Sequence, residues 1–137
     1  MKQELEQERP FSHKERLEEI NQEILEILQR QEALCRRRLW EIDKHLEMHA
    51  RLYYRYRDFF QEMVRNVEDM ATMQGQSYED HPQRLRYLSM LDEAEDKYYK
   101  TIANLESEKY RLEEEMGYLR YRKGQFLMEK KANKEER

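Results

Sequence analysis

The sequence predicts an all-α protein in which two long helices fold back on each other as an antiparallel coiled-coil hairpin. Three observations predict this fold. The 137 residues include only 3 Gly and 2 Pro, too few for the turns of a β-sandwich or barrel. Charged residues make up 41% of the chain and hydrophobic residues 38%, a balance that suits thin helices better than a globule with a large core. The hydrophobic residues also recur at steps of three and four along two segments.

The first helix is expected at about residues 12–73. Ser12 and Glu15 have the spacing of a capping box, so residues 1–11 are expected to fray. Apolar positions recur every eleven residues up to Leu39 and every seven residues after it. The positions expected to face the second helix, called the seam, are Leu17, Ile20, Ile24, Leu28, Gln31, Cys35, Leu39, Ile42, Leu46, His49, Tyr53, Tyr56, Phe60, Met63, Val67 and Met70.

One polar stretch, at about residues 74–82, is expected to form the single turn. Gly75 suits the left-handed conformation that ends a helix, and Ser77 or Asp80 suits the cap of the next one. Pro82 is tolerated only in the first turn of the helix that follows.

The second helix is expected at about residues 83–130, with residues 131–137 frayed. Its expected seam is Leu88, Leu91, Glu95, Tyr98, Ile102, Leu105, Lys109, Leu112, Met116, Leu119, Lys123 and Phe126. The whole chain, residues 1–137, is thus expected to form a single helical hairpin.

Pairing about the turn places residue i beside residue 155 − i, so that Arg36–Arg38 fall about one turn from Glu113–Glu115. Charge is blocked along the chain, with nine acids against five bases in 1–35, five against eight in 36–65, eight against two in 66–96, and eight against eleven in 97–137. These blocks are expected to help choose the alignment of the two helices rather than to stabilise them strongly.

Several functional classes are not expected. No apolar run is long enough to cross a membrane, residues 1–14 lack the apolar core of a signal peptide, and the mild net charge of −4 does not favour nucleic acid. A single cysteine, Cys35, cannot form an internal disulfide, which fits a reducing cytoplasm.

The strongest candidate for chemistry is the pair His45 and His49, which is spaced to ligate one metal from one helix face, with Glu41 as a third ligand. Leu46 stands where a zinc protease motif has its Glu, so we expect a structural histidine pair and neither an enzyme nor a cofactor or metal.

Large aromatic residues outside the seam, interleaved with small ones, favour a surface that binds another helix. The predicted partner-binding residues are Trp40, Tyr54, Phe59, Tyr99, Ala103, Tyr110, Gly117 and Tyr121.

The stretches HLEMHARLYYRYRDFFQEM (residues 45–63) and YRLEEEMGYLRYRKGQFL (residues 110–127), on either side of a polar turn, resemble the small helical partner proteins of LXG toxins of the bacterial type VIIb secretion system. The resemblance implies a hairpin that binds the helical N-terminal domain of an LXG toxin, with a second small helical protein as a further partner, and targets the toxin for export. It implies a cytoplasmic protein and leaves open export together with the partner. Related secretion substrates have a Trp-x-Gly motif in the turn, whereas Trp40 of this chain lies inside the expected first helix. The Tyr-x-x-x-Asp/Glu pattern of the export signal also falls inside the expected helices.

The alternative function is a structural coiled-coil stalk of a flagellar or type III export apparatus, acting as a homodimer or an ATPase-associated rod. A metal-dependent helical enzyme is the third alternative. A stalk is expected to behave well when purified alone, whereas a targeting factor is expected to need its partner.

Overall fold

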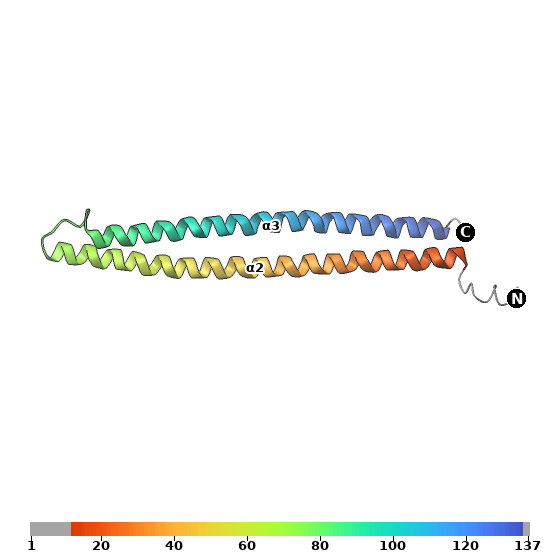
Figure 1. Cartoon of the computed structure of the whole chain (residues 1–137), viewed down its shortest axis with the longest axis horizontal. Coiled ribbons are helices and arrows are strands. Elements are labelled where there is room, and N and C mark those ends of the chain that lie inside the picture. The colour runs from red at the N-terminus through yellow and green to blue at the C-terminus, as the bar shows by residue number, and fades with distance from the viewer. Residues whose placement is uncertain (1–11, 136–137) are drawn as a thin grey trace, which may run out of the picture. The chain divides into compact units, whose positions relative to one another are not determined.

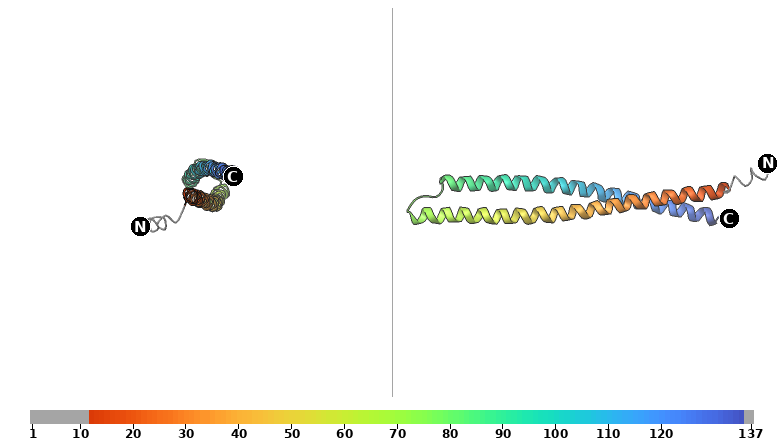
Figure 2. Two further views of the ribbon diagram at one scale, coloured as in Figure 1. Left: turned by 90° about the vertical axis from the view of Figure 1, so that its right-hand side faces the viewer. Right: turned by 60° about the horizontal axis from the view of Figure 1, so that its bottom comes forward.

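The computed structural model describes residues 12–135, with side chains up to residue 132. It contains two helices, α2 (His13–Met73) and α3 (Pro82–Glu135), which run antiparallel beside each other (Figure 1), and Figure 2 shows the same pair from two further sides. The predicted all-α hairpin is confirmed. Helix α3 ends five residues later than predicted, so residues 131–135 are helical, while the fraying expected for residues 1–11 lies outside the described residues.

Helix α2 begins with the predicted capping box. The backbone N–H of Glu15 donates to Ser12 Oγ (3.2 Å), and the backbone N–H of Ser12 donates to Glu15 Oε2 (3.1 Å). Two backbone donors that the first helical turn leaves unpaired are thereby satisfied, and His13 can start the helix.

Gly75 ends helix α2 as predicted. Its φ of +71° is the left-handed conformation that glycine adopts without a steric penalty. The backbone N–H of Gly75 donates to the carbonyl of Thr72 (3.0 Å), and that of Gln76 donates to the carbonyl of Ala71 (2.8 Å). These bonds satisfy carbonyls in the last turn of the helix.

His81 caps helix α3, in place of the predicted Ser77 or Asp80. The backbone N–H of Gln83 donates to His81 Nδ1 (3.2 Å), and Pro82 occupies the first helical position, where its missing N–H costs nothing. A ring nitrogen thus accepts the capping hydrogen bond that was expected to go to a hydroxyl or carboxylate oxygen, because His81 is the residue directly before Pro82.

The packing of the two helices divides into two compact units. The first unit comprises Met1–Arg38 and Leu112–Arg137, and the second comprises Leu39–Arg111. Each unit contains a piece of both helices and therefore has its own stretch of seam.

The predicted seam of α3 is confirmed in both units. Every one of its predicted positions is buried or half-buried, and Leu112, Met116 and Leu119 of the first unit are at most 9% exposed. Covered polar residues such as Glu95 and Lys109 interrupt the apolar seam, as expected for residues that specify register.

The predicted seam of α2 is wrong near both ends of the helix. In six cases a predicted member is less buried than the residue directly after it: Ile20/Asn21, Ile24/Leu25, Gln31/Glu32, Tyr56/Arg57, Met63/Val64 and Met70/Ala71. The first unit therefore keeps heptad spacing instead of steps of eleven, and the eleven-residue step lies between Tyr53 and Val64 in the second unit.

Ion pairs between the helices give the register of the second unit. Asp43 pairs with Lys109 and Glu68 pairs with Arg84, each at 2.9 Å. Both pairs of residue numbers add up to 152, about one turn of helix away from the predicted 155.

Candidate protein-binding faces

All eight predicted partner-binding residues are exposed. The six large side chains among them have exposed fractions between 47% (Tyr54) and 64% (Tyr110), and Ala103 and Gly117 are exposed as well. Exposure is necessary for binding, and the seam accounts for none of these residues.

The eight residues lie on different faces. In an antiparallel helix pair, residues that directly follow seam positions lie on one side of the pair, and residues that directly precede seam positions lie on the other. In the second unit the first kind forms what we call the tyrosine face, made of Trp40, Tyr54, Tyr99, Ala103 and Tyr110. Phe59 directly precedes buried Phe60 and belongs to the opposite side.

A stack of tyrosines anchors the tyrosine face. Tyr53 of α2 and Tyr98 of α3 stack with ring centroids 4.3 Å apart and planes within 9° of parallel. Each ring also contacts the exposed tyrosine that follows it in the chain, with ring centroids 5.5 Å apart in both Tyr53–Tyr54 and Tyr98–Tyr99. The Arg57 guanidinium lies over the Tyr54 ring at 4.7 Å. Burial raises the pKa of Tyr53 and of Tyr98, so both rings remain neutral phenols at physiological pH.

On α3, the first unit carries a row of alternating small and large residues, which we call the glycine row: Gly117, Tyr121, Gly124 and Met128. Tyr121 is 62% exposed and Met128 74%, and Gln125 donates to the Tyr121 hydroxyl (2.8 Å). A Cβ added at Gly117 or Gly124 would meet no atom within 4 Å. The two glycines therefore leave open notches between large side chains.

Helix α2 carries a second apolar row that the sequence analysis had partly assigned to the seam. In the first unit it consists of Leu17, Ile20, Ile24, Ile27 and Leu34, which we call the isoleucine row. These side chains have exposed fractions between 36% and 67%, and they follow heptad spacing with only Gln31 as a polar member. The signal in the sequence is the run of adjacent apolar pairs, such as Ile24–Leu25 and Ile27–Leu28.

The second unit has a methionine-rich groove on the side opposite the tyrosine face. Two hollows that share Met63, Gln83 and Tyr87 in their walls join into one groove. The apolar lining side chains that are exposed or half-buried define the methionine groove, and they are Phe59, Met63, Met70, Met73, Tyr87 and Met90. Four of the chain's eight methionines thus lie in one groove. Sequence reasoning missed it, because it placed Met63 and Met70 in the seam.

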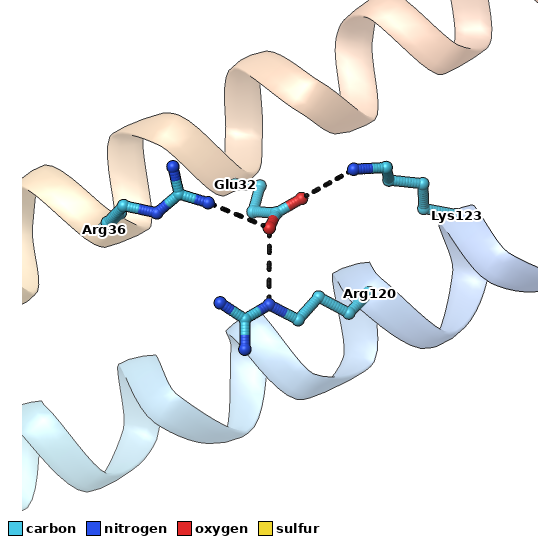
Figure 3. A network of polar contacts seen from close by, with 4 residues as sticks. All are labelled: Glu32, Arg36, Arg120 and Lys123. Atoms are coloured by element: carbon cyan, nitrogen blue, oxygen red, sulfur yellow. Dashed lines mark hydrogen bonds and ion pairs between the residues drawn. The ribbon is translucent and has the colours of Figure 1, made fainter.

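A buried carboxylate, Glu32, holds the seam of the first unit (Figure 3). Its side chain is 9% exposed and accepts hydrogen bonds from Arg120 Nε (3.3 Å) and Lys123 Nζ (3.4 Å) across the pair. Arg36 donates to the same carboxylate at 3.1 Å along α2, instead of reaching toward Glu113–Glu115 as predicted. The bond from Arg120 lowers the pKa of Glu32 against the opposing effect of burial, so the carboxylate is charged at neutral pH.

The residues singled out as metal ligands are not grouped into a metal site in the described part of the chain. His45 is exposed and His49 is half-buried, and no three His, Cys, Asp or Glu side chains among the described residues are grouped to hold a metal ion. Cys35 is buried, and burial together with Glu115 raises the pKa of its thiol. The thiol is therefore a poor nucleophile at neutral pH.

No protein-family model, curated protein or solved structure matches this chain. Neither described helix contains an apolar stretch of the length and composition that crosses a bilayer. The described surface carries rows of exposed apolar side chains.

Proposed function

We propose that this protein is a non-enzymatic helical binding protein that packs lengthwise on another helical protein. The observation that carries the proposal is the isoleucine row. It is a row of exposed Leu and Ile at heptad spacing, and it lies next to the seam that already packs against α3. A helix that contacts one neighbour needs one apolar row, and a second row at an adjacent phase suits a second helical neighbour. Helix α2 therefore has the pattern of a bundle helix of which one neighbour, α3, is present.

The magnitude of this surface indicates an extended contact. Burying a Leu or Ile side chain completely stabilises by about 1.5 to 3 kcal/mol, so half-exposed members contribute about 1 kcal/mol each. Five such residues give about 5 kcal/mol, which is near the low end of the roughly 4 to 15 kcal/mol that association costs. The partner therefore has to contact more than this row, and the tyrosine face, glycine row and methionine groove are the available surfaces.

The partner class follows from the resemblance to the small helical partners of LXG toxins. We propose the elongated helical N-terminal domain of such a toxin as the partner, with this chain acting as a type VIIb secretion targeting factor or chaperone. A long helical domain offers the extended surface that the energetic argument requires. The tyrosine face adds amphipathic contact area of the composition typical of interfaces.

Co-expression with a candidate toxin domain tests the proposal. The double variant Ile24→Lys/Ile27→Lys places two charges in the isoleucine row, and we expect it to weaken co-purification at least about 10-fold. The matched control is Gln22→Lys/Gln29→Lys, which adds the same charge at exposed positions that directly follow seam residues. Circular dichroism checks that both variants keep their helicity.

Equal co-purification of the two double variants would show that this row binds nothing. A chain that forms a stable homodimer and takes up no toxin domain would instead favour the coiled-coil stalk of a flagellar or type III export apparatus.

A further inference from the structure

We propose that the methionine groove of the second unit is the docking site for a basic amphipathic helix of the partner. The proposal rests on the proposed function, because it takes the partner to be helical, and it adds the partner's charge and the place where it docks.

The lining of the groove suits an inserted helix. On α2, Phe59, Met63, Met70 and Met73 stand at steps of four, seven and three, so they form one heptad row beside the seam. Met70 is 56% exposed and Met73 is 87% exposed. Methionine is flexible and polarisable, and it is common on surfaces that receive the apolar face of a helix.

The charges around the groove select a basic occupant. In the heptad of this row, Glu62 and Asp69 hold the flanking positions that face a partner's charged residues, and Asp69 also lines the groove. Neither carboxylate makes an ion pair within the described residues 12–132. Met73 and Gln83 both line the groove, and the chain segment that connects them carries two further acids, Glu79 and Asp80.

The other wall of the groove contributes one cation. Arg86 of α3 lines it, so the acidic side is the α2 side. Lys and Arg on the edge of a partner helix that faces α2 would meet unpaired acids, which favours one orientation of that helix. A second copy of this chain using the same groove symmetrically would bring two acidic edges together, which disfavours self-association through it.

Two designed peptides serve as probes. Each has about three heptads with Leu at the two core positions, and one carries Lys and the other Glu at the flanking positions. We expect the full-length chain to bind the Lys peptide at least about 10-fold more tightly than the Glu peptide by fluorescence anisotropy, with the difference shrinking at high salt.

Charge reversal locates the site. Glu62→Lys/Asp69→Lys is expected to remove or invert the preference. Asp92→Lys/Asp96→Lys, which makes the same charge change on exposed residues of α3 that directly follow seam positions, is expected to leave it unchanged. Phe59→Ser/Met70→Ser is expected to weaken binding of the Lys peptide. Both residues are exposed, so the hairpin should remain folded.

Equal binding of the two peptides, or the same response to both charge-reversal variants, would overturn the basic occupant. If the chain forms a dimer and the variant Phe59→Ser/Met70→Ser dissociates that dimer, the occupant of the groove is a second copy of the chain. That result would also overturn the basic occupant. The co-purification experiment with Ile24→Lys/Ile27→Lys changes residues of the first unit only, whereas the groove lies in the second unit. A failure of the proposed function can therefore be distinguished from a failure of the proposed docking site.

Discussion

Glu32 gives the first unit a pH dependence that a purely apolar seam would not have. The bonds from Arg120 and Lys123 keep its pKa below the ordinary value of 4.5. The folded state therefore binds the proton less readily than the unfolded chain does. The stabilisation by this carboxylate is complete above the unfolded pKa and disappears as the pH falls through the lowered, folded pKa.

We therefore expect Glu32→Gln to lower the melting temperature at pH 7, because the amide cannot pair with both cations. The gap between variant and wild type should shrink as the pH falls below about 4.5, since wild-type Glu32 is then progressively protonated. Thermal melts followed by circular dichroism measure this gap, with Glu23→Gln at an exposed position as the control. A gap that stays constant down to strongly acidic pH would show that the charge of Glu32 plays no part in stability.

At the scale of the helices, the sequence predicted α3 well and α2 only in its middle. Along α3, residues adjacent to the seam are mostly charged or small, so the apolar period has a single possible phase. Along α2, adjacent residues such as Ile24 and Leu25 are both apolar. Spacing alone cannot say which of two neighbouring rows faces α3, because that depends on the partner helix.

The same reasoning explains what could be predicted of the binding faces. Exposed Trp40 and Tyr54 were identifiable, because the middle of α2 keeps the predicted phase, in which Leu39 and Tyr53 directly before them lie in the seam. The methionine groove was not, because Met63 and Met70 continue the heptad of the preceding residues and only the packing shows that Val64 and Ala71 replace them.

Two substitutions on α2 separate seam from surface. Phe60 is 6% exposed and contacts Tyr56, Phe59 and Tyr87, so Phe60→Ala should destabilise the hairpin by about 3 kcal/mol. Trp40 is 62% exposed, so Trp40→Ala should change the free energy of unfolding by less than about 1 kcal/mol.

Urea titrations of the two variants measure both changes in the free energy of unfolding. Trp40→Ala should also weaken co-purification with the partner, since large exposed aromatics often anchor interfaces. Equal loss of stability in both variants would show that the packing of the seam around Trp40 differs from the one described.

At the scale of the whole molecule, the question is how many faces a partner covers. The isoleucine row and the two glycines of the glycine row belong to the same unit but lie on opposite sides of the helix pair, because the isoleucine row directly precedes seam positions whereas Gly117 and Gly124 directly follow them. A partner that uses both must surround the pair or supply two helices. A partner that uses one leaves the other row free, and a variant in the glycine row then has no effect on binding.

Gly117→Leu tests the second face directly. No atom lies within 4 Å of a Cβ at Gly117, so the isolated chain has room for the new side chain, and removing a helical glycine should stabilise it by roughly 0.5 to 1 kcal/mol. The same leucine fills the notch beside Tyr121, where a partner helix would approach. We expect a higher melting temperature together with weaker co-purification, whereas Gly117→Ala, which gains helix propensity but little volume, should show only the first effect. If Gly117→Leu binds the partner as well as wild type does, the partner leaves this face exposed, and the contact is confined to the side of the isoleucine row.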